Sequence, residues 1–491
     1  MTTNSRSPFC ALTIVHRHGK LDSYDKKEPR SSCLDLESLL LRCFRLVAAP
    51  HLALKHFASL RLPEKLSLSR RNNNATLRKL PSIILATVEW GKKWNILLLT
   101  ICLLIGWNYR LPWLSFYSPF GWEGMPSVDF HTFYLAGKSW LLQANPYVSP
   151  SRGFVYPPTS LPFFGIFTLF DFKFASQLWW VTYLSLFVVA LLAFALTLKG
   201  DRKYVYLSLA VLLFLTSYPL LDIMQFGQID LLISDLSVLS LLCERLKHRS
   251  VSAVMLSIAT LLKGPALLLL IYFVLFRRDL QYLAQFLVST LMIVGASLLI
   301  IPIGLYEYYI VNVLPTLSIA LASDWNQSLT GLITLAHMSQ ITPVVSVAGF
   351  VLFGIFSFWV SSKKLASGSK SLRVDAMFLM NVLVMLLFGP RSTIYPYAWV
   401  ILPLALFLSA LLMEQVKLTY LALVVFATFL LNSVLAPDFL RSTASAVVAP
   451  HFINYHVLFP SELVGNLILI ISLIPIYLHP RTIFRHVKTV Q

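Results

Sequence analysis

Two ionisable side chains stand where ordinary packing does not require them. Asp129 precedes a helix-like run, FHTFYLAGKSWLL, and Lys263 interrupts a long apolar run between Val251 and Phe276. A carboxylate near the start of a helix is favoured by the helix dipole, and it can take a proton from a hydroxyl group. A cation within an apolar run is costly unless it faces a cavity or an anion. We therefore predict that Asp129 is a general base and that Lys263 contacts an anionic ligand.

Both residues also have a purely structural interpretation. From its position alone, Asp129 could serve only as the N-cap of its helix. Lys263 could extend its ammonium group to the membrane interface while its methylene groups stay in apolar surroundings. These interpretations stay open at the level of the sequence.

The composition indicates an all-α polytopic membrane protein. Hydrophobic residues make up 57% of the chain and charged residues 13%, and apolar runs recur from about Trp94 to the C-terminus. A soluble domain carries roughly twice that charged fraction. The formal charge of +18 does not indicate nucleic-acid binding, because Lys and Arg concentrate near the N-terminus and in short loops, which is the positive-inside pattern. The five cysteines show neither metal-ligand spacing nor a disulfide framework.

Residues 1–93 are predicted to be a basic cytoplasmic region that is partly amphipathic. Apolar residues recur at helical spacing between Leu36 and Leu66, with basic residues interleaved. This pattern predicts one or two helices on an anionic membrane surface, and a poorly ordered extension is the alternative. The first long apolar run starts about 90 residues into the chain, so we expect no cleaved signal peptide.

Residues 94–491 are predicted to hold about twelve membrane helices, with both termini in the cytoplasm. The spans are expected near residues 94–112, 174–198, 204–221, 229–243, 251–276, 283–303, 342–361, 375–389, 396–413, 418–436 and 459–478. The span at 251–276 is predicted to be two half-helices that turn at Lys263-Gly264-Pro265, because broken helices are tolerated where they line a cavity. This places Arg277 and Arg278 inside, whereas a single crossing would place them outside.

Four segments left outside are rich in polar and aromatic residues, and we expect them to roof one cavity. They are residues 113–172, 222–230, 304–340 and 389–397. The first is predicted to be an external catalytic loop that carries juxtamembrane helices.

Short motifs follow one another along this predicted external face. They comprise Asp129, Phe130, Phe133, Ala136, Leu141, Asn145, Pro146, Tyr147, Tyr156, Pro157 and Pro158, then Gly227-Gln228-Ile229-Asp230, then Lys263 and Pro265, then Asn326-Gln327-Ser328-Leu329-Thr330-Gly331. In this order they resemble glycosyltransferase family 87, the polyprenyl-phosphate-mannose-dependent mannosyltransferase group of the GT-C superfamily. The resemblance covers most of residues 94–400. Each motif alone is weak, whereas four in order are fairly specific.

The resemblance implies a GT-C-like hexosyltransferase in a bacterial plasma membrane, with its active site on the periplasmic side. It would move a sugar, with mannose the first expectation, from a polyprenyl-phosphate carrier to a glycolipid or cell-envelope glycan, with inversion. Its partners would be this lipid-linked donor, the acceptor and the bilayer, with no nucleic acid. No cofactor or metal is expected, because the sequence shows neither an Asp-x-Asp motif nor a His cluster.

The remaining candidate residues have roles in binding. Gln228, Asn326 and Gln327 are predicted to hydrogen-bond sugar hydroxyls, although Asn326-Gln327-Ser328 is also a glycosylation sequon. Arg391 and Arg152 are predicted to help bind the carrier phosphate, with a solvated loop position as the alternative for Arg152.

Two aromatic residues complete the set of candidates. His131 is predicted to orient Asp129, and Tyr156 to stack on a sugar face. The alternatives are a structural histidine and an aromatic anchor at the membrane interface.

One segment departs from the family pattern. The family has Ser-Pro followed by Trp and His near an external helix end, whereas residues 389–397 read GPRSTIYPY, without His and with Trp399 as the nearby Trp. The departure bears on the donor sugar more than on the reaction class. Two rival functions remain: a secondary transporter with a site between broken helices, and an inactive membrane assembly subunit.

Overall fold

The computed structural model describes residues 128–148, 153–323, 326–362, 370–414, 416–432, 461–478 and 483–484. All of them belong to the compact unit Leu60–Gln491. The predicted N-terminal region 1–93, the predicted span 94–112 and Arg152 therefore lie outside the described residues.

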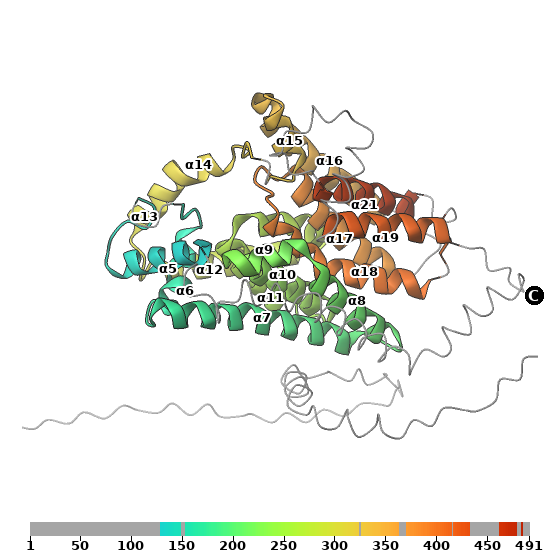
Figure 1. Ribbon diagram of the computed structural model, residues 1–491, viewed down its shortest axis with the longest axis horizontal. Helices are drawn as coiled ribbons and strands as arrows, with labels where there is room; N and C mark the ends of the chain where they lie inside the picture. Colours follow the sequence, from blue (N-terminus) through green and yellow to red (C-terminus); the bar gives the residue numbers. More distant parts are fainter. Residues whose placement is uncertain are drawn as a thin grey trace, which may run out of the picture. The chain divides into compact units, whose positions relative to one another are not determined.

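The described residues form helices and no strand, which confirms the all-α prediction for this part of the chain. The elements, shown in Figure 1, are α5 (Val128–Leu141), η1 (Pro158–Ser160), α6 (Leu161–Phe167), α7 (Phe172–Thr197), α8 (Arg202–Thr216), α9 (Tyr218–Phe226), α10 (Asp230–Arg245), α11 (Arg249–Leu262), η2 (Gly264–Leu269), η3 (Ile271–Phe276), α12 (Leu280–Ser297), α13 (Ile303–Tyr308), η4 (Tyr309–Val313), α14 (Leu314–Leu317), α15 (Leu329–Leu335), η5 (Ser339–Ile341), α16 (Thr342–Ser362), α17 (Lys370–Phe388), η6 (Tyr395–Val400), α18 (Ile401–Met413), α19 (Leu418–Asn432) and α21 (Ser461–Leu478).

Within the described residues, six helices are long and apolar enough to cross a bilayer. They are Phe172–Thr197, Leu280–Ser297, Ser339–Ser362, Ser371–Phe388, Tyr395–Met413 and Ser461–Leu478. Each of the six overlaps a predicted span. By length and hydropathy, the described residues do not reach the predicted total of about twelve membrane helices. One reason is local chemistry near Ser217, whose hydroxyl caps the Leu220 amide at 3.1 Å. Together with Pro219 in the next turn, this cap divides the predicted span 204–221 between α8 and α9.

The predicted break at Lys263 is present. The helix α11 ends at Leu262, and Lys263 takes an extended conformation with φ −150° before Pro265 starts a tighter helix. The chain then returns toward its starting side, because Arg277 forms an ion pair with Glu244 at the end of α10. This geometry agrees with two half-helices rather than one crossing.

A buried ionic cluster marks the end of the bundle opposite that break. Asp375, at the start of α17, is fully buried and accepts hydrogen bonds from Arg202 of α8 and Arg245 of α10. Arg202 also donates to the Leu406 carbonyl in α18 at 3.1 Å. We call Arg202, Arg245 and Asp375 the ionic cluster. It connects α8 and α10 with α17 and α18, which lie more than 100 residues later in the chain.

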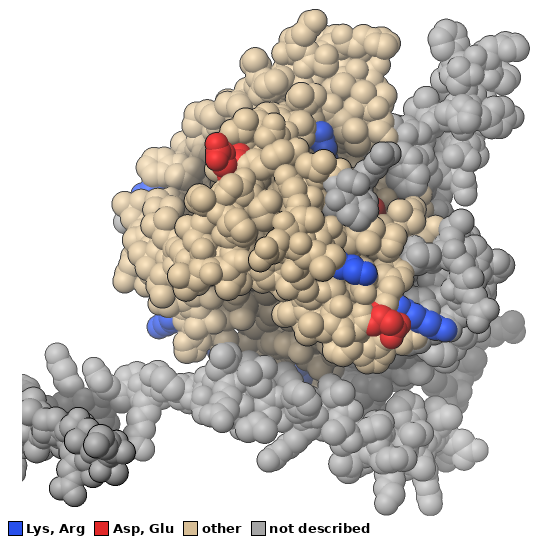
Figure 2. All heavy atoms as spheres, turned by 90° about the vertical axis from the view of Figure 1, so that its left-hand side faces the viewer, with Lys and Arg blue, Asp and Glu red and all other residues tan. Residues whose placement is uncertain are grey.

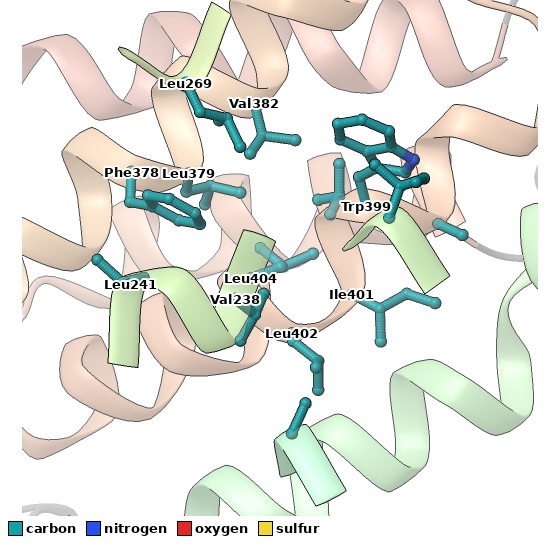
Figure 3. Close-up of a cluster of buried hydrophobic side chains, with 14 of the residues drawn as sticks. Val238, Leu241, Leu269, Phe378, Leu379, Val382, Trp399, Ile401, Leu402 and Leu404 are labelled. Carbon is teal, nitrogen blue, oxygen red and sulfur yellow. The ribbon is translucent and has the colours of Figure 1, made fainter. Parts of the chain in front are cut away.

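The apolar core lies between the ionic cluster and the polar end of the bundle. Figure 3 shows side chains of α10, η2, α17 and α18 packed together with Trp399 of η6. Burying side chains of this size stabilises the fold by roughly 1.5–3 kcal/mol each in water, and in lipid the gain comes mainly from close packing. This packing fixes the ends of α10 and η6 that carry polar groups.

Candidate functional site

The helix α5 is held against the bundle by its aromatic face. Phe130 stacks on Trp179 with ring centroids 5.3 Å apart, and Phe133 stacks on Phe164 at 4.7 Å. At Gly137, an added Cβ would lie 2.8 Å from the Phe164 and Gly165 backbone, so α5 packs on α6 more closely than any other residue would allow. These contacts fix the first turn of the helix.

Asp129 lies in that first turn and forms a hydrogen bond across the fold. Gln228 Nε2 donates to Asp129 Oδ2 at 2.6 Å, and Gln228 Oε1 accepts from the Tyr156 hydroxyl at 3.2 Å. Gly227 before it has φ +71° and closes α9, while its carbonyl accepts from Trp179 Nε1 at 2.9 Å. The structure therefore brings Asp129, Gln228 and Tyr156 together, although they come from three separate segments.

Lys263 is paired with a carboxylate rather than free. Its Nζ lies 2.7 Å from both carboxylate oxygens of Asp230, which is fully buried, while the Lys263 side chain is 20% exposed. Trp399 Nε1 donates to Asp230 Oδ1 at 3.0 Å. The Lys263 ammonium also lies 5.9 Å from the centre of the Tyr156 ring. Lys263 is thus part of the same site as Tyr156, and it keeps one N–H that Asp230 does not engage.

The surroundings of Asp129 favour a proton acceptor of increased basicity. Burial raises the pKa of Asp129 above its ordinary value, and the negative charge of Asp230 adds to this effect. The hydrogen bond from Gln228 and the positive charge of Lys263 lower the pKa and partly offset the rise. Burial also raises the pKa of Tyr156 well above its ordinary value, so its hydroxyl remains a hydrogen-bond donor.

The Asn326 and Gln327 side chains are buried, and their contacts connect two loops. Asn326 Nδ2 donates to the Leu321 and Pro390 carbonyls, each at 3.0 Å. The Gln327 backbone amide donates to the Ser392 carbonyl at 2.9 Å, and its carbonyl accepts from the Tyr397 hydroxyl at 2.6 Å. Because Asn326 is only 4% exposed, it is poorly placed as a glycosylation acceptor.

The contacts of Arg391 and His131 lead away from the Asp129 group. Arg391 donates to the Thr316 and Ile319 carbonyls near the end of α14. His131 is exposed and meets the edge of the Phe172 ring at 5.0 Å. Neither contact includes Asp129 or Lys263. The role of Arg391 in phosphate binding and that of His131 in orienting Asp129 remain predictions.

Sequence reasoning did not assign a role to Asp230 or Trp399. A cation in an apolar run requires an anion nearby, and that signal could have pointed to Asp230, two residues after Gln228. Nothing local in the sequence marks Trp399 as the second hydrogen-bond donor to Asp230. Among the described residues, no three His, Cys, Asp or Glu side chains come together as a metal site requires.

The arrangement offers a proton acceptor beside a paired cation at one end of a bundle of apolar helices. A search of the curated proteins finds no match to the chain. Residues 154–390 match the family model of glycosyltransferase family 87. The matched stretch contains Tyr156, Gln228, Asp230, Lys263 and Asn326, and Asp129 precedes it. This match over residues 154–390, together with the long apolar helices, indicates a membrane glycosyltransferase similar to glycosyltransferase family 87.

Proposed function

We propose that this protein transfers a hexosyl group, mannose in the first instance, from a polyprenyl-phosphate carrier to a hydroxyl of a glycolipid or cell-envelope glycan. The observation that carries the proposal is the hydrogen bond between Asp129 and Gln228 beside the Lys263–Asp230 pair. It sets one basic carboxylate close to one cation, which is what transfer from a phosphate leaving group needs.

In this reaction Asp129 acts as the general base. An acceptor hydroxyl oxygen attacks the anomeric carbon of the sugar while Asp129 takes the hydroxyl proton. The bond between the anomeric carbon and the phosphate oxygen breaks, and polyprenyl phosphate leaves with the electron pair. One carboxylate suffices for a single inverting displacement, whereas most glycoside hydrolases need two. The raised pKa of Asp129 suits this role, because a stronger base accepts the proton more readily.

The carrier phosphate is assigned to Lys263. Two of its three N–H groups face Asp230, and the third is available to a phosphate oxygen. Figure 2 shows the face seen on the left of Figure 1, where charged side chains are few and scattered. The phosphate would therefore be bound by an individual cation within the site rather than by a broad basic surface.

An apolar cavity beside the site suits the prenyl chain. It measures about 330 Å³, is partly open and is lined by residues that include Thr159, Phe163, Leu232, Leu261 and Leu262. The Thr159 hydroxyl donates at 2.7 Å to the carbonyl of Leu261, two residues before Lys263. A chain in this cavity would lead its phosphate toward Lys263, since cavity wall and cation belong to adjacent residues.

The charge distribution supports an external site and cytoplasmic termini. Arg202, Arg245, Arg249 and Arg277 all lie at helix ends away from Lys263, and each of them pairs with a carboxylate there. Basic residues concentrate on the cytoplasmic side of membrane proteins. We therefore propose that the Asp129 end faces the periplasm of a bacterial plasma membrane.

Two other functions are weaker alternatives. A secondary transporter conflicts with the glycosyltransferase family match, although the broken helix at Lys263 would also suit one. An inactive assembly subunit would keep the fold without transfer, so only an activity measurement separates it from an enzyme.

The direct test uses the full chain in lipid nanodiscs with labelled mannose on a synthetic polyprenyl phosphate. We expect label to move to a lipid or glycan acceptor from this donor and not from a nucleotide-linked mannose. Transfer from the nucleotide sugar in the absence of carrier would contradict the proposed donor. If no carrier-linked sugar is transferred, the assembly-subunit alternative gains weight.

The pH dependence of transfer offers a second test. Gln228→Leu removes the hydrogen bond that lowers the pKa of Asp129, so that pKa should rise further. A base works only when deprotonated, and activity is lost as pH falls through its pKa. The acid limb of the kcat/KM profile should therefore move to higher pH in the variant.

Thr132→Val is the matched control for this measurement. Thr132 lies on the same helix, and its hydroxyl donates to the Val128 carbonyl at 3.3 Å. Its acid limb should coincide with that of the wild type. A Gln228→Leu limb that stays in place or moves to lower pH would show that Asp129 is not the titrating base.

A further inference from the structure

The Asp230 carboxylate is the least solvent-exposed charge of the site. It is 0% exposed and accepts hydrogen bonds from Lys263 Nζ through both oxygens and from Trp399 Nε1 through one. It follows directly after the segment that carries Gln228, so it cannot move away from the site without moving the Asp129 partner. Asp230 is thus a fixed negative charge against the cation assigned to the carrier phosphate.

The charges around this position do not add up to a strongly anion-binding site. The charges that act on Asp129 are those of Lys263 and Asp230, one positive and one negative. Arg391 donates its hydrogen bonds to the backbone carbonyls of Thr316 and Ile319. When Asp129 is deprotonated, the Asp129, Lys263 and Asp230 side chains together place one cation beside two carboxylates. A phosphate that enters is attracted by Lys263 and repelled by Asp230.

Lys263 and Asp230 affect the binding of the two forms of the carrier to different extents, because the two phosphates differ in charge. In the donor, phosphate is a diester with one negative charge. In the spent carrier it is a monoester, whose second ionisation lies near pH 6, so it carries about −1.5 to −2 at pH 7. Coulomb energy is proportional to charge, so a fixed negative group disfavours the spent carrier more than the donor. A site with Lys263 alone would hold the spent carrier the more tightly of the two.

We propose that Asp230 sets the preference of this site for the phosphodiester donor over the phosphomonoester product, and so promotes release of the spent carrier. The inference rests on the proposed function, because it names the discrimination made by the same site. Asp230 acts on the phosphate through its charge and through Lys263, without taking a proton from the acceptor. Trp399 keeps the carboxylate in place.

The test compares the KM for the lipid-linked donor with the inhibition constant, Ki, of polyprenyl phosphate, using the full chain in nanodiscs. Asp230→Asn keeps the shape, can still accept from Trp399 and removes the charge. Its ratio of Ki to KM should fall by about tenfold or more, because the doubly charged product gains more than the donor. Product inhibition during a progress curve should increase accordingly.

Two further variants separate charge from structure. Asp230→Glu retains the negative charge, and its Ki to KM ratio should stay near that of the wild type. Trp399→Phe removes one hydrogen bond without altering any charge, so its ratio should also stay near the wild-type value. A ratio that falls equally in all three variants would assign the effect to packing and overturn the inference.

Failure of the inference is distinct from failure of the proposed function. A wild type that uses the donor, together with an Asp230→Asn variant whose ratio is unchanged or increased, would overturn the role of Asp230 alone. A wild type that neither uses the donor nor binds polyprenyl phosphate would overturn the proposed function, and this inference with it.

Discussion

Replacing Asp129 with Asn is expected to lower the rate of sugar transfer by about 10²- to 10⁴-fold, the usual contribution of a positioned general base. Asn keeps the size of the side chain and can still accept a hydrogen bond from Gln228, but it cannot take a proton from a hydroxyl. The loss should appear in kcat, because the substituted atom acts on the acceptor proton in the transition state.

Measurements on the purified full chain in nanodiscs, with labelled lipid-linked mannose, can resolve this effect. Binding of polyprenyl phosphate to Asp129→Asn should persist, since Lys263 and Asp230 are unchanged. Lys138→Gln is the matched control, because Lys138 is an exposed residue in the last turn of the same helix. It should transfer sugar at the wild-type rate. An Asp129→Asn variant as active as this control would remove Asp129 from the chemistry.

Local features of the fold were predictable from the sequence. A helix after Asp129 and a break at Lys263-Gly264-Pro265 are both present, because each depends on residues within one or two turns. The six long apolar helices overlap predicted spans, since a long apolar run has few alternatives to crossing a bilayer. The two short helices at 204–221 were predicted as one span, because a Ser cap followed by Pro is a weak signal within an apolar run.

Pairings between distant segments were not predictable in the same way. Lys263 and Asp230 are separated by 33 positions, and Trp399 and Asp230 by 169, so no periodic pattern links them. The sequence predicts that Lys263 contacts an anionic ligand, and the structure adds that its ammonium group pairs with Asp230. The motif predicts Asn326 as a sugar ligand, and it gives no sign that the Asn326 amide donates to the Leu321 and Pro390 carbonyls.

The ionic cluster shows how strongly such long-range pairings hold the bundle together. Asp375 is fully buried and pairs with both Arg202 and Arg245, which are themselves only 14% and 21% exposed. Asp375→Asn leaves two guanidinium groups without their shared anion in a poorly solvated place. Breaking a buried ion pair from one side costs about 3–5 kcal/mol. We expect the free energy of unfolding, measured by denaturation in mixed micelles, to fall by that order.

Asp279→Asn provides the matched control, because it is the same substitution at an ion pair nearer the surface. Asp279 pairs with Arg249, which is 50% exposed, and its side chain caps the Tyr282 amide at 3.0 Å. Asn caps helices about as well as Asp, and a solvent-exposed ion pair contributes about 0–1 kcal/mol. The control should therefore lose at most about 1 kcal/mol. If the two variants lose equal stability, burial does not increase the contribution of Asp375 to the free energy of unfolding. The apolar core rather than the ionic cluster would then hold α8, α10 and α17 together.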